Sequence, residues 1–334
     1  NLESLREKYP EGAEKYKKEK IKEIFMEIHG IGDAIAQEIV DLNIFTIEEL
    51  KKRQNEKLRG KKKNLPLLTK QQQKALVYLE ETKERIPRSE IENFEKLFKK
   101  EFIELLNEKA ESLKNHIFEI TGSYRRGKPD SGDIDVLFTA YNNNKLIYYD
   151  FKKRLVSKNI IVAELTKGND KSMVIGKLTP DSKARRIDLL YATPEERPFA
   201  LLYFTGSKEF NTAMRQLALS QQLTLNEHEF QKINKQKEKI GKVTQIFKSE
   251  KDIFNYLNME YKEPYQRIDA NSVVIKSLPE PQTLPEPQTL PEPQTLPEPQ
   301  TLPEPQAEPP EEQAEPPEQQ AEPPEQQAEP PEQQ

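Results

Sequence analysis

The fold of this chain is decided by residues 122–136, which read Gly-Ser-Tyr-Arg-Arg-Gly-Lys-Pro-Asp-Ser-Gly-Asp-Ile-Asp-Val. From Asp133 to Ala140 the sequence has a period of two, which predicts a β-strand. Side chains two residues apart on a strand point to the same face, so Asp133 and Asp135 present two carboxylates side by side. No Lys or Arg is adjacent to them in sequence, and we therefore expect a divalent cation to supply the counter-charge.

The residues upstream of this acidic pair are suited to binding phosphate. Gly122 and Ser123 offer backbone N–H groups and a hydroxyl. Arg125 and Arg126 add guanidinium groups, whose planar N–H donors match phosphate oxygens. An Asp-x-Asp pair at a strand edge is often merely solvated, and it is the Gly-Ser dipeptide ahead of it that favours a functional site here.

A third carboxylate, Asp188, follows in the segment Arg185-Arg-Ile-Asp-Leu-Leu190. It stands between large aliphatic residues, where an unpaired carboxylate is costly to desolvate. If this segment is a strand beside the Asp133 strand, all three carboxylates converge on one face, which is the arrangement that two-metal phosphoryl transfer requires. Taken alone, Asp188 is equally well explained as an ion-pair partner of Arg185.

The composition differs sharply between the two ends of the chain. Residues 278–334 contain no Lys or Arg, but 18 of the 26 prolines and 14 of the 57 acidic residues. The other 277 residues carry all 52 basic residues, so a basic body with a net charge of +9 is joined to an acidic tail. A basic body suggests a polyanionic partner, with nucleic acid first.

Several classes of site are excluded by composition. The absence of cysteine rules out disulfides, a thiolate zinc site and a cysteine nucleophile, and three histidines are too few for a His-rich metal site. Any metal should therefore be a hard cation held by carboxylates. No apolar run approaches the roughly 20 residues that span a bilayer, so we expect no membrane association.

The remaining elements are read from hydrophobic spacing. Helices are predicted around Ile21–Ile28 and Ile35–Leu42, from Thr46 into the basic run Lys51–Lys63, and over Leu67–Glu84, Ser89–Lys114 (with Ser89 as N-cap) and Phe199–Gln222. Strands are predicted at Ile117–Thr121, Asp133–Ala140, Ile160–Leu165, Met173–Leu178 and Arg186–Tyr191.

Two further segments have a functional and a structural interpretation. Gly30 and Gly32 permit a tight hairpin between two helices, whose free backbone N–H groups would grip a phosphate without reading bases; a corner that only packs could use the same glycines. The tail repeats Leu-Pro-Glu-Pro-Gln-Thr and then Ala-Glu-Pro-Pro-Glu-Gln-Gln, which is typical of an extended solvated spacer. Its alternative interpretation is docking to a basic partner surface.

Over roughly residues 20–268 the chain resembles the family X DNA polymerases of the beta type. The resemblance rests on six motifs in the family's order: His29-Gly-Ile-Gly32, Arg85-Ile-Pro-Arg88, Gly122–Gly127, Ser131-Gly-Asp-Ile-Asp135, Arg185-Arg-Ile-Asp188 and Leu202-Tyr-Phe-Thr-Gly-Ser207.

This resemblance implies an α+β fold. The expected order is a charged lead-in (1–19), a helix-hairpin-helix DNA-binding subdomain (20–87), a nucleotidyltransferase palm with a mixed β-sheet (88–192), a small α/β nucleotide-selecting subdomain (193–268) and a disordered Pro/Glu/Gln repeat tail (269–334).

The resemblance also implies residue roles. Asp133, Asp135 and Asp188 would bind two Mg²⁺ ions, with Mn²⁺ able to substitute, and Asp188 would touch only the ion that activates the primer 3′-hydroxyl. Asp188 is then the candidate proton acceptor, with Arg186 as its orienting partner on the DNA side. The incoming deoxynucleoside triphosphate would be held at its phosphates by Ser123, Arg126, Gly132 and Arg85, at its sugar by Tyr203, Phe204 and Gly206, and at its base by Asn211.

Contacts to DNA are implied at several places. Arg215 would meet the nascent base pair from the minor-groove side, Lys171 would lie near the primer terminus, and Glu227 would help fix the closed state. At the hairpin of Gly30 and Gly32, the carbonyls of Met26, Ile28 and Ile31 would hold a monovalent cation, K⁺ or Na⁺, that bridges to a primer phosphate.

We therefore expect a monomeric DNA-directed DNA polymerase that fills short gaps in base excision repair. Its substrates would be primed or gapped duplex DNA and deoxynucleoside triphosphates, and a repair-protein partner could be reached through the tail. Two alternatives stay open: template-independent terminal transfer, because the Gly-Ser and Asp-x-Asp block is shared across nucleotidyltransferases, and a non-catalytic DNA-binding scaffold.

Three features depart from the family pattern. Residues 1–19 are too short for the lyase domain of the repair-type members, so lyase activity is not expected of this sequence, which either lacks that domain or begins after it. Lys208 stands where an acidic residue is expected, which leaves nucleotide selection open. The repeat tail has no counterpart.

Overall fold

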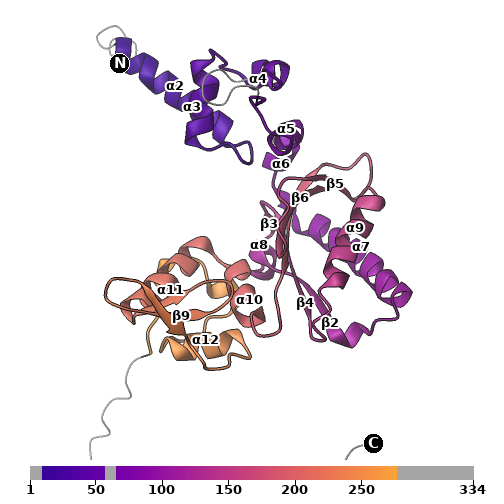
Figure 1. Ribbon diagram of the computed structural model, residues 1–334, viewed down its shortest axis with the longest axis vertical. Helices are drawn as coiled ribbons and strands as arrows, with labels where there is room; N and C mark the ends of the chain where they lie inside the picture. The colour runs from indigo at the N-terminus through magenta and orange to yellow at the C-terminus, as the bar shows by residue number, and fades with distance from the viewer. Residues whose placement is uncertain (1–9, 57–64, 277–334) are drawn as a thin grey trace, which may run out of the picture. The chain divides into compact units, whose positions relative to one another are not determined.

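The computed structural model describes residues 10–56 and 65–276, which lie within the first of two units of the chain, Asn1–Leu278 (Figure 1). The start of the expected lead-in, part of the basic run and the repeat tail from residue 277 lie outside the described residues. Within the described ranges, none of the helices is both long enough and apolar enough to cross a membrane.

The first described part of the chain is helical. Its helices are α2 (Pro10–Met26), α3 (Asp33–Asp41), α4 (Ile47–Arg53), α5 (Lys70–Val77) and α6 (Leu79–Lys83). Helix α2 runs without a break across the expected boundary at residue 19, so residues 10–19 belong to the first helix of the hairpin. The helix expected over 67–84 is wrong at its start and its middle: Thr69 forms a capping box with Gln72, and Tyr78 separates α5 from α6.

The central part is built on a five-stranded mixed sheet with the order β2-β4-β7-β6-β5. Its strands are β2 (His116–Ile120), β4 (Ile134–Ala140), β5 (Ile161–Glu164), β6 (Lys171–Gly176) and β7 (Arg185–Tyr191), which confirms all five predicted strands with ends shifted by one or two residues. β4 and β7 are parallel, whereas the other neighbours are antiparallel. A second, two-residue pairing joins β1 (Ile86–Pro87) to β3 (Asp130–Ser131).

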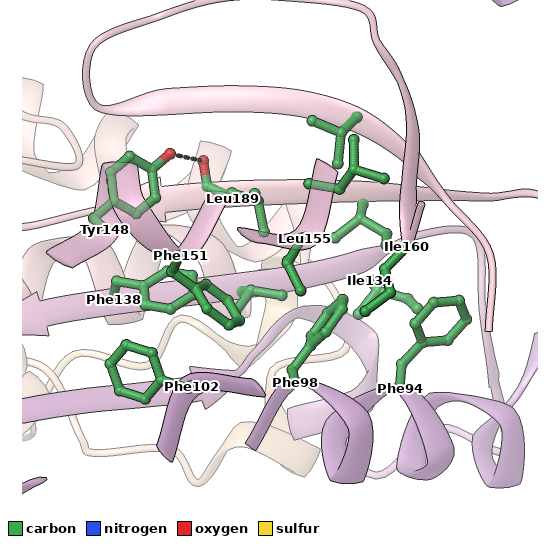
Figure 2. Close-up of a cluster of buried hydrophobic side chains, with 14 of the residues drawn as sticks. Phe94, Phe98, Phe102, Ile134, Phe138, Tyr148, Phe151, Leu155, Ile160 and Leu189 are labelled. Carbon is green, nitrogen blue, oxygen red and sulfur yellow. Dashed lines mark hydrogen bonds between the residues drawn. The ribbon is translucent and has the colours of Figure 1, made fainter. Parts of the chain in front are cut away.

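Helices α7 (Arg88–Glu108) and α9 (Leu146–Ser157) cover one face of this sheet (Figure 1). Figure 2 shows Phe98 and Phe102 of α7 in one cluster with Phe138 and Phe151, where the edge-on contacts of Phe98 and Phe102 with Phe151 add to the burial of apolar area. The predicted Ser89 N-cap is wrong, because α7 already begins at Arg88, directly after Pro87, whose ring fixes φ near the helical value. The helix also ends at Glu108, short of the expected Lys114, where Ala110 adopts a positive φ of 54°.

Short elements connect these parts. A 3-10 helix (Leu113–Asn115) leads into β2, and the short helix α8 (Gly122–Arg125) follows β2 directly. Helix α8 places the Gly-Ser motif beside the first residues of β4, because Thr121 N, just ahead of α8, donates to the Asp135 carbonyl at 2.8 Å.

The last part contains α10 (Arg197–Thr205), α11 (Lys208–Ser220), a three-stranded sheet of β8 (Leu223–Leu225), β9 (Phe230–Ile233) and β10 (Lys239–Lys242), and α12 (Glu250–Tyr256). The single helix expected over 199–222 is wrong, because Gly206 has a φ of 68° and Ser207 caps a new helix through Phe210 N. The tail expected from residue 269 is also wrong for its first residues. After a 3-10 helix at Pro264–Gln266, Asp269 caps another at Ala270–Ser272, and Ile275 pairs with Met259.

Candidate active site

The three predicted carboxylates lie on one face of the sheet. In the parallel pair β4–β7, Asp135 is the register partner of Asp188, and neighbouring strands lie about 4.8 Å apart. Ile134 and Ile187 point into the core under α7 and α9, so the residues beside them, Asp133, Asp135 and Asp188, point to the opposite face. The expected convergence of two distant strands therefore occurs, and it follows from strand pairing.

The side chains of the two consecutive arginines of β7 point to opposite faces of the sheet. Arg185 is buried and forms a two-bonded pair with Glu90 of α7 at 2.7 Å, so it is not a partner of Asp188. Arg186 lies on the carboxylate face and donates to Asp133. The counter-charge that the sequence failed to show beside Asp133 thus comes from a residue 53 positions later in the chain.

Asp135 and Asp188 are left without such a partner. Asp188 is only 7% exposed, and its Oδ1 atom is buried with no hydrogen-bond partner. Burial, followed by repulsion from Asp133, raises the pKa of Asp188 to about 6. Burial and the charges of Asp133 and Asp188 likewise raise the pKa of Asp135. Like charges on neighbouring strands repel each other, and a bound cation would remove that penalty.

The three carboxylates do not form a closed cage in this structure. In the part of the chain that is described, no group of three His, Cys, Asp or Glu side chains is drawn together closely enough to hold a metal as it stands. The carboxylate of Asp133 is instead paired with the guanidinium of Arg186. Metal binding at this site would therefore have to compete with the Arg186 guanidinium for Asp133.

The Gly-Ser motif lies directly against Asp135. Gly122 has a φ of 62°, and a Cβ on it would overlap the Asp135 carboxylate, so only glycine fits there. Ser123 follows on helix α8, where its hydroxyl donates to Ser131 at 2.7 Å. Arg126, the C-cap of α8, donates to the carbonyl of Thr205 at the end of α10.

These elements enclose a hollow of about 560 Å³ between the sheet and α10–α11. It is lined by most of the residues predicted to bind nucleotide and DNA, together with Lys208 and Thr212: Gly122, Ser123, Arg126, Asp133, Asp135, Lys171, Tyr203, Phe204, Gly206, Lys208, Asn211, Thr212 and Arg215. Asp188, Arg85, Gly132 and Glu227 are not among the residues that line it.

One wall of the hollow is aromatic and basic. The ammonium of Lys171 lies 5.1 Å from the ring centre of Phe204, and the guanidinium of Arg215 lies 5.1 Å from that of Tyr203. Asn211 donates from Nδ2 to the Tyr203 carbonyl at 2.7 Å, which ties α11 to α10. Cations and rings alternate on this wall, as is typical of nucleotide-binding surfaces.

Three predicted residues lie further out. Arg85 forms a salt bridge with Asp130 at 2.6 Å and lies beside Gly132, whose Cβ position would be 3.3 Å from its Nη1. Glu227 lies 3.9 Å from Arg215, at the limit of an ion pair. In this structure Arg85 is therefore paired at the rim and does not reach the hollow.

The glycine hairpin joins α2 to α3. Gly30 adopts a φ of 85°, and Gln72 of α5 donates to its carbonyl at 2.7 Å. Gly32 is the N-cap residue of α3, without a side chain to occupy the first N–H groups of that helix. The Ile28 carbonyl accepts from Ile31 N at 3.0 Å, whereas the carbonyls of Met26 and Ile31 accept no hydrogen bond from the loops and side chains of the described residues.

Sequence reasoning missed the residues behind the hollow. Arg125, read as a phosphate ligand, donates instead to Thr205 Oγ1 at 2.7 Å and to Glu250 at 2.8 Å. No local pattern marks Glu250, which lies 125 residues from Arg125 and looks like any first-turn acidic residue of a helix.

The fold and the site define a nucleotidyltransferase, in which a palm-like mixed sheet carries the carboxylates and a second α/β part follows it. Residues 85–194 match the family model of the DNA polymerase beta palm, and residues 200–268 match that of the DNA polymerase beta thumb. The chain therefore belongs to the family X DNA polymerases, which use divalent metal ions.

The chain is also similar to curated proteins. It is 28% identical over 259 residues to DNA polymerase lambda of Rattus norvegicus, 27% over 260 residues to DNA polymerase lambda of Arabidopsis thaliana, and 26% over 281 residues to DNA nucleotidylexotransferase of Xenopus laevis. Each match covers 73% of this chain but only 42%, 46% and 51% of the respective relative. The chain thus spans about half the length of the relatives it matches.

Proposed function

We propose that this chain is a DNA-directed DNA polymerase that adds deoxynucleotides to a primer 3′-hydroxyl, in short-gap filling during base excision repair. The observation that carries the proposal is the pair formed by Asp135, which lines the hollow together with Arg126, Lys171 and Arg215, and its register partner Asp188, whose buried Oδ1 has no hydrogen-bond partner among the described residues. A triphosphate brings negative charge to the basic wall, and divalent ions bring positive charge to the carboxylates.

The residues fit a pair of Mg²⁺ or Mn²⁺ ions. Asp188 Oδ1 is buried without a hydrogen-bond partner, and the donor set consists of hard carboxylate oxygens, which these ions prefer. Asp133, Asp135 and Asp188 would hold them. When bound, such ions lower the pKa of the attacking hydroxyl and neutralise the triphosphate.

The protein's own groups supply the rest of the chemistry. Asp188 would receive the proton of the primer hydroxyl, as the carboxylate next to the ion that activates that hydroxyl. Ser123, Arg126 and Gly132 would bind the triphosphate, with Arg85 released from Asp130 to reach it. Tyr203, Phe204 and Gly206 would contact the sugar. Asn211 and Arg215 would contact the base pair, with Glu227 holding Arg215.

The helical part is proposed to hold the DNA. The free N–H groups at Gly32 and the start of α3 would bind a primer phosphate, and the carbonyls of Met26, Ile28 and Ile31 would bind a K⁺ or Na⁺ ion next to it. Because the Ile28 carbonyl already accepts one hydrogen bond, the ion would use its second lone pair.

The test is nucleotide incorporation by Asp188→Ala on a primed template. We expect the rate to fall by about three orders of magnitude or more, because ion binding and proton transfer are lost together. The matched control is Asp181→Ala, another aspartate of the same part of the chain outside the hollow, which should incorporate at the wild-type rate. Incorporation that depends on Mg²⁺ also distinguishes a polymerase from a non-catalytic scaffold. A wild-type rate of incorporation by Asp188→Ala would contradict the assignment of Asp188 to the active site.

Template-independent transfer is the second candidate function. It is supported by the similarity to a relative named DNA nucleotidylexotransferase. Parallel incorporation on one-nucleotide-gapped, recessed and single-stranded DNA separates the two. A polymerase prefers the first two substrates, whereas a terminal transferase extends the single strand as fast.

A further inference from the structure

A second cluster of buried charges lies behind the hollow. Glu250, at the start of α12, accepts hydrogen bonds from Arg125 at 2.8 and 3.2 Å and from Arg267 at 2.5 Å. Arg125 also donates to Thr205 Oγ1 at 2.7 Å. We call Arg125, Thr205, Glu250 and Arg267 the latch.

The latch is deeply buried. Glu250 is 5% exposed and Arg267 is fully buried, with its guanidinium 5.2 Å from the ring centre of Phe254. A carboxylate at this depth is stable only while its arginine partners stay in place, because an unpaired buried charge is strongly destabilising. The latch therefore holds its four members in one arrangement.

Both ends of the latch continue into residues that line the hollow. On one side Arg125 precedes Arg126, and the Arg126 guanidinium donates to the carbonyl of Thr205, the residue that Arg125 holds by its hydroxyl. On the other side the Arg267 carbonyl accepts from Ser207 N at 3.3 Å. Gly206 lies between these two attachments and lines the hollow.

We infer that Glu250 is a positioning residue for the nucleotide pocket. Through Arg125 and Arg267 it sets where Arg126 and the turn at residues 205–207 stand, and thereby sets the affinity for the incoming deoxynucleoside triphosphate. The inference rests on the proposed function in taking the hollow as the nucleotide site. It assigns no contact between Glu250 and substrate.

The test compares two buried carboxylates of the full chain. Glu250→Gln keeps the shape of the side chain but replaces one acceptor oxygen with a donor that cannot bond to arginine. Glu101→Gln is the matched control: Glu101 is 4% exposed and is paired with Arg154 at 2.7 Å, but it lies on α7, on the far side of the sheet from the hollow. Both variants should lose stability, and only Glu250→Gln should affect the nucleotide.

Nucleotide affinity is measured without chemistry, as the Kd of a matched deoxynucleotide for the complex with a dideoxy-terminated primer–template, by calorimetry in the presence of Mg²⁺. For Glu250→Gln we expect the Kd and the KM to rise about tenfold and kcat to stay within about threefold of wild type. A tenfold rise in Kd corresponds to the loss of roughly one charge-assisted hydrogen bond. Glu101→Gln should keep the wild-type Kd and KM. Equal changes in both variants, or an unchanged Kd in Glu250→Gln, would overturn the inference.

A milder pair of variants covers the case in which Glu250→Gln does not fold. Thr205→Val removes the hydroxyl that accepts from Arg125, and Thr205→Ser restores it. We expect a raised Kd in the first and a wild-type Kd in the second; a Kd that is the same in both contradicts the inference. If the wild-type protein binds the deoxynucleotide but does not incorporate it, the proposed function is contradicted, whereas the comparison of nucleotide Kd values between the variants stays valid.

Discussion

Two buried charge clusters lie within this chain, and they are built in opposite ways. In the latch, Glu250 accepts from both Arg125 and Arg267, so this carboxylate has its counter-charge within the protein, while Nη2 of Arg267 is buried without a hydrogen-bond partner among the described residues. On the carboxylate face, Asp135 and Asp188 are register partners on paired strands, and Oδ1 of Asp188 is buried without a hydrogen-bond partner among the described residues. The carboxylate of the first cluster is thus paired by folding, whereas under the proposed function a bound cation would pair those of the second.

The largest contrast should appear in stability. Glu250→Ala leaves Arg125 and Arg267 buried without their counter-charge and should lower the free energy of unfolding by about 3–5 kcal/mol. Asp188→Asn removes a charge that the fold does not compensate, so its free energy of unfolding without metal should not fall below that of wild type. Urea unfolding at neutral pH measures both. A loss of equal size in the two variants would mean that the clusters are not different in kind.

Metal addition should sharpen the same contrast. Because the ions bind the folded state only, Mg²⁺ at one hundred times its Kd should stabilise the wild-type protein by about 2.7 kcal/mol. Asp188→Asn should gain much less, and Glu250→Gln should gain as much as wild type, since the latch holds no ion. Thermal unfolding with Mg²⁺ and with EDTA gives these differences. Stabilisation of Asp188→Asn to the wild-type extent would place the ions elsewhere.

The smallest effect is a pH dependence of the latch. Burial opposes the charge of Glu250, but hydrogen bonds from Arg125 and Arg267 more than offset it and lower the pKa of Glu250 below 4.5. A carboxylate with a lowered folded-state pKa contributes stability that is complete above pH 4.5 and is lost as the pH falls through the folded-state pKa. The free energy of unfolding should therefore fall less steeply with acidification in Glu250→Gln than in wild type. Identical slopes would show that Glu250 titrates normally.

Much of the carboxylate face could be predicted because its signals are local. The spacing of Asp133 and Asp135 places both on one side of any strand, and the five strands were found from the same periodicity within one or two residues. Helix ends were predicted less well. Ser89 has the residue type of a cap, but Pro87 already sets the start of α7, and Gly206 interrupts an otherwise helical pattern that gives no other sign of a break.

What the sequence determined by itself is therefore the chemistry: two carboxylates on one strand and, upstream of them, a Gly-Ser dipeptide and arginines suited to phosphate. What only the tertiary structure decided is which charge meets which. Strand register placed Asp188 beside Asp135, the alternation of faces gave Arg186 to Asp133 and Arg185 to Glu90, and chain folding brought Glu250 to Arg125. These pairings depend on packing between segments far apart in the chain, and a local sequence pattern therefore cannot predict them.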